Sequence, residues 1–146
     1  MKTVKHTLVV PHTQIQMYEL VNDLNSYPQF VPGCVGVDIL EQGLERMTAA
    51  LHLQKGPIKQ TLKTRNTLQA PFKIEMQFLE GPFKYFSGSW HFNEHNGATR
   101  VTFELQFDFE SPWIGLMFGP FFEHITHNWL EAFRKRADHV YGTPHA

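Results

Sequence analysis

The sequence contains a single cysteine, Cys34, and this excludes an internal disulfide. It also lacks an excess of one charge, because 13 lysines and arginines nearly balance 14 aspartates and glutamates. Any contact with nucleic acid must therefore come from a local cationic patch rather than from the field of the whole protein. The longest nearly unbroken apolar run, residues 113–122, is too short for the ~20 residues of a membrane-spanning helix. These absences exclude a disulfide scaffold, a globally basic protein and a helical membrane protein.

Size and composition indicate one folded domain. The chain of 146 residues fits a single domain spanning residues 1–146, and a domain of this size buries roughly 70% of the surface of its unfolded chain. Apolar residues make up 42% and charged residues 18%, without a long run of one charge, which excludes a disordered chain. The segment after Met1 lacks the apolar core of a secretion signal, so a reducing, cytoplasmic location is expected.

Helical spacing occurs at both ends of the chain. Residues 3–10 alternate as a strand does, and Thr13 and Gln16 then have the spacing of a capping box, which predicts a helix start. A second short helical turn is expected around residues 29–31. Ser111 and Pro112 predict the start of a long helix that reaches Tyr141, although Pro120 predicts a kink or break near residue 119. The apolar stripe of this helix comprises Phe118, Phe122, Ile125, Trp129, Phe133, Ala137 and Val140.

Between these helices the apolar residues recur with a period of two, as in half-buried strands. The alternation is clear in three sets: Met47, Ala49, Leu51 and Leu53; Phe72, Ile74, Met76 and Phe78; Val101, Phe103, Leu105, Phe107 and Phe109. Turn-forming pairs separate the runs, namely Gly56-Pro57, Ala70-Pro71, Gly81-Pro82 and Asn96-Gly97. We therefore expect about seven consecutive antiparallel strands.

Four segments resemble one protein family: Ser26–Cys34, Thr64–Asn66, Gly81–Trp90 and Ala132–Gly142. They are similar to the family of coenzyme Q-binding START-domain proteins and bacterial ribosome association toxins (RatA), within the polyketide cyclase/dehydrase and lipid transport superfamily. The resemblance implies an α+β, START-like helix-grip fold. In that fold a curved antiparallel sheet of about seven strands wraps around a long C-terminal helix, with one or two short helices after the first strand.

The resemblance implies two functions. The first is a carrier or chaperone that binds ubiquinone or a similar polyprenyl lipid for respiration and quinone synthesis. The second is a toxin that binds the large ribosomal subunit and blocks subunit joining, thereby inhibiting translation. Mitochondrial members would carry a basic, Ser-rich leader, whereas strand-like alternation here begins within five residues of Met1, so a bacterial chain is favoured. Neither function involves DNA or a cofactor other than the bound quinone.

An interior binding site is expected at polar residues that break the apolar pattern. If the strand over residues 59–68 turns Leu62 inward, Thr64 and Asn66 also enter the interior, where an unpaired amide costs ~1–3 kcal/mol. Their partners could be the oxygens of a quinone head group, or backbone and ordered water. Composition does not distinguish a hollow interior from a filled one. The residues expected to line a pocket are Phe30, Leu51, Leu53, Asn66, Met76, Phe78, Trp90, Phe103, Phe107, Phe122, Ile125 and Trp129.

Cationic residues suggest a second kind of contact. Lys59, Lys63 and Arg65 share one strand face, with Lys55 and Lys73 near its ends. Such a stripe could meet ribosomal RNA phosphates or anionic lipid head groups, or be the solvated face of a strand.

The apolar segment 113–122 would expose part of its surface on a helix. The exposed part would suit lipid exchange and transient peripheral contact with the inner membrane, or it contacts residues 28–33. Nine histidines occur without a ligand set at zinc spacing, so no metal is expected. Cys34 has no recognisable His-Asp arrangement around it, and the inward faces supply no poised acid or base. We therefore expect a protein that is not an enzyme.

Overall fold

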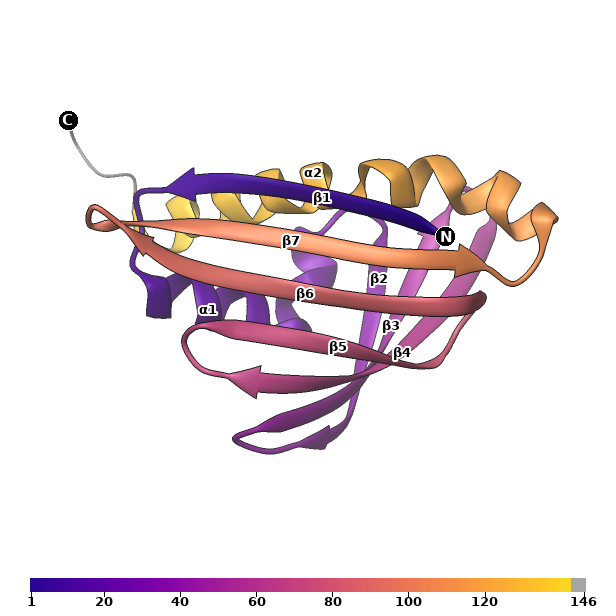
Figure 1. The fold of residues 1–146 in the computed structure, drawn as a ribbon, viewed down its shortest axis with the longest axis horizontal. Coiled ribbons are helices and arrows are strands. Elements are labelled where there is room, and N and C mark those ends of the chain that lie inside the picture. The colour runs from indigo at the N-terminus through magenta and orange to yellow at the C-terminus, as the bar shows by residue number, and fades with distance from the viewer. Residues whose placement is uncertain (143–146) are drawn as a thin grey trace.

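The computed structural model describes residues 1–142. Seven strands form one antiparallel sheet in the order β1-β7-β6-β5-β4-β3-β2. The strands curve beneath the last helix, α2, which runs along β1 (Figure 1). This is the START-like helix-grip arrangement expected from the sequence. The elements are β1 (Lys2–Val10), α1 (Gln14–Asn22), the 3-10 helix η1 (Leu24–Gln29), β2 (Cys34–Gln42), β3 (Arg46–Lys55), β4 (Ile58–Gln69), β5 (Lys73–Glu80), β6 (Phe83–His95), β7 (Ala98–Phe109) and α2 (Pro112–Tyr141).

The strands follow the predicted alternation of buried and exposed residues. Val101, Phe103, Leu105 and Phe107 of β7 are all buried, while the residues between them are only partly covered. The hairpin from β6 to β7 turns at Asn96 and Gly97, both with positive φ (50° and 83°), as a tight two-residue hairpin requires. Phe72 departs from the prediction, because it lies in the turn before β5 and is 60% exposed.

The capping box predicted at α1 is present. The Thr13 hydroxyl accepts a hydrogen bond from the Gln16 backbone N–H (3.2 Å), and the Gln16 side chain accepts one from the Thr13 N–H (2.9 Å). The helical turn expected around residues 29–31 is wrong in position, since η1 already ends at Gln29. The buried Tyr27 hydroxyl donates to the Val21 carbonyl and folds this segment back on α1, so the turn forms earlier.

The prediction near residue 119 was a kink or a break, and the break is wrong, because the long helix α2 is continuous from Pro112 to Tyr141. Pro120 removes the hydrogen bond to the Leu116 carbonyl, but Leu116 is 76% exposed, so water can satisfy that oxygen. On the inner side, the buried rings of Phe118 and Phe122 fix the helix on both sides of the proline. Tertiary packing thereby outweighs the local preference. The predicted stripe is buried except at Val140, which is 49% exposed, because Tyr141 makes the contact with α1 through its hydroxyl and the Gln16 carbonyl (3.1 Å).

At one edge of the sheet, β2 is irregular. The pairing of β2 with β3 shifts between Cys34 and Gly36 and again between Ile39 and Glu41. The two residues at these bulges, Val35 and Leu40, are more than half exposed (52% and 54%).

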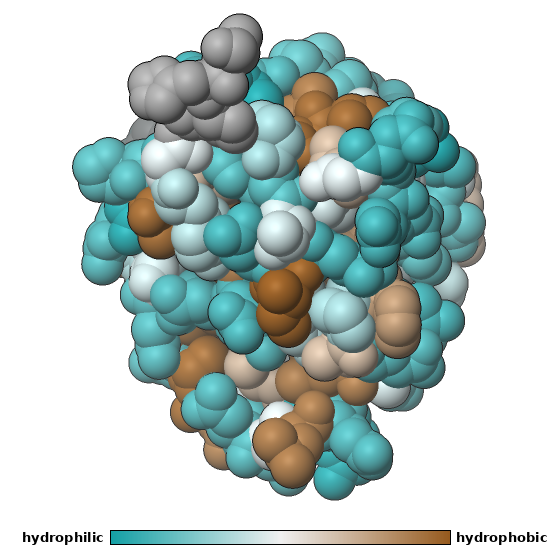
Figure 2. All heavy atoms as spheres, turned by 90° about the vertical axis from the view of Figure 1, so that its left-hand side faces the viewer, coloured by the Kyte–Doolittle hydropathy of each residue, from teal (hydrophilic) through white to brown (hydrophobic). Residues whose placement is uncertain are grey.

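The face of the molecule in Figure 2 is mostly hydrophilic, and its apolar residues form separate patches between hydrophilic ones. Within residues 1–142, no helix has the length and apolar character needed to cross a membrane.

Candidate functional site

Aromatic rings fill the space between the sheet and α2. Trp90 of β6 stacks on Phe103 of β7, with ring centroids 3.9 Å apart and planes 7° from parallel. Trp129 of α2 stacks on the same Phe103 at 6.0 Å, and Phe133 meets Trp90 edge-on at 5.3 Å. All four side chains are at most 5% exposed. Toward the start of α2, a second group of rings comprises Phe78, Phe83, Phe86, Phe107, Phe109 and Phe122.

A polar pair lies inside this apolar interior. Thr64 and Asn66 point inward from β4 and are each 4% exposed. The Thr64 hydroxyl donates to the Asn66 side-chain carbonyl over 2.9 Å. Within residues 1–142 this is the one hydrogen bond between the Asn66 side chain and another protein group. The amide N–H groups of Asn66 are donors that a ligand could use.

A cavity of about 20 Å³ lies beside this pair. A space of this size holds at most about one water molecule, whereas sites for small organic ligands measure about 300–1,000 Å³. The cavity beside Thr64 and Asn66 is therefore too small for a ligand of that kind. The lining residues are Val21, Leu24, Tyr27, Leu51, Thr64, Asn66, Ile74, Met76, Trp90 and Trp129.

The cavity brings together five of the predicted pocket residues: Leu51, Asn66, Met76, Trp90 and Trp129. Five more are buried elsewhere in the core, namely Leu53, Phe103, Phe107, Phe122 and Ile125, and Phe78 is half-buried against it. Sequence reasoning missed Val21, Leu24 and Tyr27, which come from α1 and η1. The apolar face of α1 was visible in the sequence, but nothing there showed that it closes this end of the sheet.

Two titratable groups near the cavity are kept neutral by burial. Desolvation raises the pKa of the Tyr27 hydroxyl well above its usual value, and the nearby Cys34 and Asp23 act in the same direction. Burial also raises the pKa of the Cys34 thiol, and this effect exceeds the lowering by a backbone hydrogen bond with Gly36. Neither group is poised for proton transfer near neutral pH.

The loop after η1 contacts the first half of α2. Gly33 has φ +81°, and a Cβ atom at this position would lie 2.5 Å from the Phe121 ring. Nearby, the Trp129 indole N–H donates to the Pro32 carbonyl over 3.0 Å. The contact predicted between residues 28–33 and 113–122 is therefore present. The predicted exposure in the same segment is also present, because Trp113 and Leu116 are 58% and 76% exposed.

An open groove of about 570 Å³ lies on the outer side of α2, and we call it the α2 groove. Its lining residues are Phe30, Pro32, His127, Asn128, Glu131, Ala132, Lys135, Arg136 and His139. The Arg136 guanidinium lies 5.0 Å above the Phe30 ring and donates to the Gln29 side-chain oxygen over 3.0 Å. The structure thus places Phe30 in the α2 groove rather than in the interior pocket expected from the sequence.

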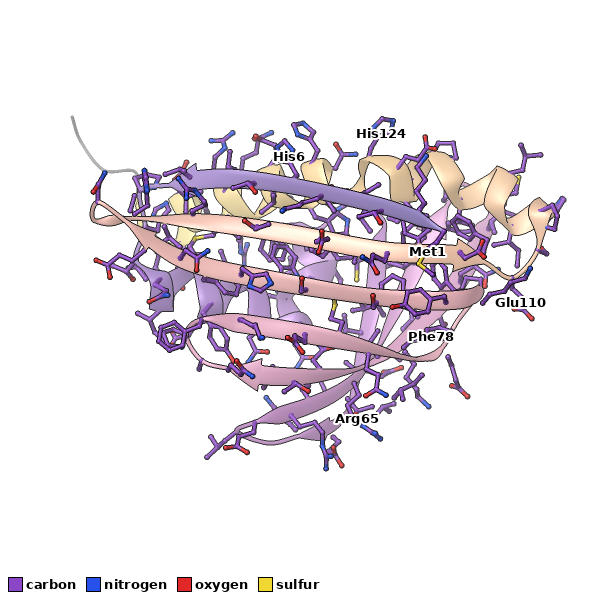
Figure 3. All side chains as sticks on the ribbon, viewed as in Figure 1. Met1, His6, Arg65, Phe78, Glu110 and His124 are labelled. Atoms are coloured by element: carbon purple, nitrogen blue, oxygen red, sulfur yellow. The ribbon has the colours of Figure 1, made fainter. Side chains whose placement is uncertain are left out.

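The groove extends toward β1. Nδ1 of His127 lies 3.3 Å from Nε2 of His6, and Figure 3 shows His6 and His124 along the same edge of the molecule. The acidic residue of the groove, Glu131, binds Arg134, with 2.7 Å between its carboxylate and Nη2. This hydrogen bond lowers the pKa of the Glu131 carboxyl, so the carboxylate stays ionised and paired.

The cationic stripe predicted on β4 lies elsewhere. Lys59, Lys63 and Arg65 share the outer face of β4, and the labelled Arg65 lies far from His124 and the edge formed by α2 (Figure 3). Part of this charge is neutralised, because Lys63 lies 3.2 Å from Glu80 and Lys73 lies 2.6 Å from Glu75.

Comparison with known protein families shows the family of this chain. The family described as polyketide cyclase / dehydrase and lipid transport matches residues 10–134. The chain belongs to this family. It is 43% identical to the ribosome association toxin RatA of Escherichia coli K12, over 97% of this chain and 90% of the relative. It is 25% identical to the mitochondrial coenzyme Q-binding protein of Dictyostelium discoideum, over 88% of this chain and 65% of that protein.

Solved structures share the fold. A START superfamily protein from Mycobacterium smegmatis superimposes with a TM-score of 0.76 at 18% identity, covering 94% of this chain and 98% of the other. The Zhui aromatase/cyclase from Streptomyces sp. R1128 gives a TM-score of 0.70 at 23% identity, covering 97% and 88%. The fold is therefore shared with enzymes as well as with proteins named for binding or toxicity.

Acidic, cysteine and histidine side chains are the common metal ligands in proteins. In the described part of the chain, no three of them come together in a way that could hold a metal ion. The buried His12 binds Asp138 instead, with 2.8 Å between Nε2 and Oδ1, and joins the start of α1 to the end of α2.

Proposed function

We propose that this protein associates with the ribosome through its surface and inhibits translation, the second of the two functions implied by the sequence resemblance. The observation that carries the proposal is the small volume of the interior cavity, about 20 Å³, beside Asn66. A macromolecular partner bound at the surface needs no interior space. The relatives named ribosome association toxin, which match almost the whole chain, support the choice of partner.

In this proposal the protein binds the large ribosomal subunit and blocks subunit joining. The test titrates the purified protein onto ribosomes, separates the particles on sucrose gradients at low and moderate salt, and measures cell-free translation in parallel. We expect the protein to sediment with the large subunit, joined ribosomes to decrease and translation to fall. A protein that stays at the top of the gradient at low salt and leaves translation unchanged would refute the proposal.

A second candidate function, binding of ubiquinone or another polyprenyl lipid, is supported by the polar pair Thr64 and Asn66 in an otherwise apolar interior. Carbonyl oxygens of a quinone head group could accept hydrogen bonds from the Asn66 amide. Such binding requires the cavity to widen from about 20 Å³ toward the ~300 Å³ of typical ligand sites. The side chains that would have to move include Tyr27 of η1 and Trp129 of α2, which line the cavity.

Mass spectrometry of the organic extract tests the second function, using protein purified without detergent from a bacterial host. Wild type and Asn66→Leu are compared. Stoichiometric quinone in the wild type and its depletion in the variant would support lipid binding. An extract free of polyprenyl lipid from both proteins would contradict it.

Neither proposal includes a catalytic step. The polar side chains at the cavity are Tyr27, Thr64 and Asn66, and burial raises the pKa of Tyr27 further from neutrality. The expectation that the protein is not an enzyme remains a prediction.

A further inference from the structure

The α2 groove has a pattern of charge that suits a phosphate backbone. Lys135, Arg136, His127 and His139 line it, against the single carboxylate of Glu131. That carboxylate is already bound by Arg134. By contrast, neither Lys135 nor Arg136 makes an ion pair within residues 1–142. The groove therefore has two cations that are not neutralised by a neighbouring side chain.

The spacing of these residues along α2 sets the length of the surface. His127, Glu131, Lys135 and His139 follow one another at intervals of four, and Asn128, Ala132 and Arg136 form the adjacent row. At 1.5 Å per residue, the first row is about 18 Å long. This length corresponds to about five nucleotides at ~3.4 Å each along one strand. Because the Ala132 side chain is small, it does not block the middle of the groove, and a nucleic-acid backbone can approach the helix there.

Arg136 is held in place before any ligand binds. Its guanidinium packs on Phe30 at 5.0 Å and uses one N–H for Gln29. An arginine side chain has five N–H donors, so others remain for a phosphate oxygen. Because stacking already fixes this side chain, binding would cost less conformational entropy than with a flexible lysine. Paired arginine and aromatic groups also provide a surface on which unpaired bases can stack.

The position of the groove favours RNA over a lipid surface. The most exposed apolar side chains of α2, Trp113 and Leu116, lie in its first turns, about 21 Å and 16 Å along the helix from His127. A membrane would require such large side chains beside the cations, whereas the exposed apolar residue next to them on α2 is the smaller Val140, which is 49% exposed.

We propose that the α2 groove is the RNA-contacting surface of this protein, with Lys135 and Arg136 binding phosphates. The inference rests on the proposed association with the ribosome and deepens it by naming the surface. It replaces the β4 stripe of Lys59, Lys63 and Arg65 as the primary contact, because Lys63 is paired with Glu80 and the stripe lies far from the groove (Figure 3).

The test compares two sets of neutralising substitutions. Lys135→Gln with Arg136→Gln removes the groove cations, and Lys59→Gln with Lys63→Gln and Arg65→Gln is the matched control on β4. Each protein is measured for sedimentation with ribosomes, for binding to a fluorescent single-stranded RNA oligomer at several salt concentrations, and for binding to vesicles of equal parts phosphatidylcholine and phosphatidylglycerol. Circular dichroism melts establish that the variants are folded, and Lys135→Gln alone, at an exposed position, is a second groove variant that leaves the Phe30 stack intact.

We expect the groove double variant to weaken both RNA and ribosome binding at least tenfold and to lower the salt slope by about 1.4, which is ~0.7 for each lost phosphate contact. The β4 control should bind nearly as wild type does. Equal ribosome binding by wild type and the groove variant would overturn this inference while leaving the proposed function standing. Groove-dependent binding to RNA without sedimentation with ribosomes would support the groove and overturn the proposed function. Groove-dependent binding to vesicles alone would overturn the inference in favour of a lipid surface.

Discussion

The interior beside Asn66 and the α2 groove beside Arg136 are both lined by residues of α2, yet they differ in volume and charge. The interior holds about 20 Å³ and is closed by Trp90, Trp129 and their neighbours, whereas the groove measures about 570 Å³ and is open to solvent. The interior keeps Tyr27 neutral, whereas the groove presents two unpaired cations within the described residues. The comparison teaches that the same helix can have a neutral, tightly packed side and an open side with exposed cations.

The largest expected effect is the loss of stability when an aromatic ring of the interior is removed. Trp90→Ala removes the ring stacked 3.9 Å from Phe103 and should lower the free energy of unfolding by about 3–5 kcal/mol. Urea denaturation measures the loss. Trp113→Ala, at a position 58% exposed, is the control and should change stability by no more than about 0.5 kcal/mol. Equal, small losses in both variants would mean that the interior is loosely packed.

The next effect concerns the contact between the loop after η1 and α2, at Gly33 and Phe121. Gly33→Ala requires a side chain at φ +81° and brings its Cβ atom to 2.5 Å from the Phe121 ring. Gly56→Ala is a matched control, because Gly56 has φ +58° but nothing within 4 Å of a Cβ atom. The control should lose about 1–2 kcal/mol from backbone strain, and Gly33→Ala about 1–3 kcal/mol more from overpacking. Thermal or urea unfolding checks the difference, and equal losses would show that Phe121 moves aside at no cost.

The neutral groups of the interior predict how the unfolding free energy changes at alkaline pH. Burial raises the pKa of both Tyr27 and Cys34 above their usual values of 10.0 and 9.0, so the folded state favours their neutral forms. Their contribution to stability is complete below pH ~9 and is lost as the pH rises through the folded-state values. The unfolding free energy should therefore decline above pH ~9. A combined Tyr27→Phe and Cys34→Ala variant should decline less, and an identical decline would assign the effect to other groups.

The smallest effect on stability is expected when both members of the polar pair, Thr64 and Asn66, are replaced. It tests whether the pair stabilises the fold or serves mainly to bind a ligand. Replacing both partners, Thr64→Val with Asn66→Leu, removes the 2.9 Å hydrogen bond without leaving either group unpaired. The change in unfolding free energy should be within about 1 kcal/mol of zero, whereas Asn66→Leu alone should cost about 1–3 kcal/mol. Urea denaturation of the single and double variants tests this. A large loss in the double variant would show that the pair stabilises the fold beyond its own hydrogen bond.

Local chemistry made much of the fold predictable from the sequence. The capping box at Thr13 and Gln16 and the turn at Asn96 and Gly97 depend on neighbouring residues, and both form as expected. The alternation in β7 likewise reports a sheet with one buried face. Pro120 is the exception, because the packing of Phe118 and Phe122 overrides its local preference.

The candidate site was less predictable, since its contacts join residues far apart in the chain. Phe30 is apolar, as most core residues are, but its position beside Arg136 depends on how the loop after η1 meets α2. The bond from Arg136 to Gln29 spans 107 residues, and no periodicity reports such a pairing. The sequence predicted that Lys63 belongs to a cationic stripe. Its ion pair with Glu80, however, depends on the register of β4 and β5.

The two bulges in β2 have a consequence for behaviour at high concentration. A sheet edge whose backbone groups continue regularly can template a strand from another molecule and start a fibre. On β2, the shifts at Val35 and Leu40 interrupt the ladder twice within nine residues. An incoming strand would lose its register at each interruption, so the exposed Val35 and Leu40 can be tolerated at this edge without promoting amyloid-like assembly.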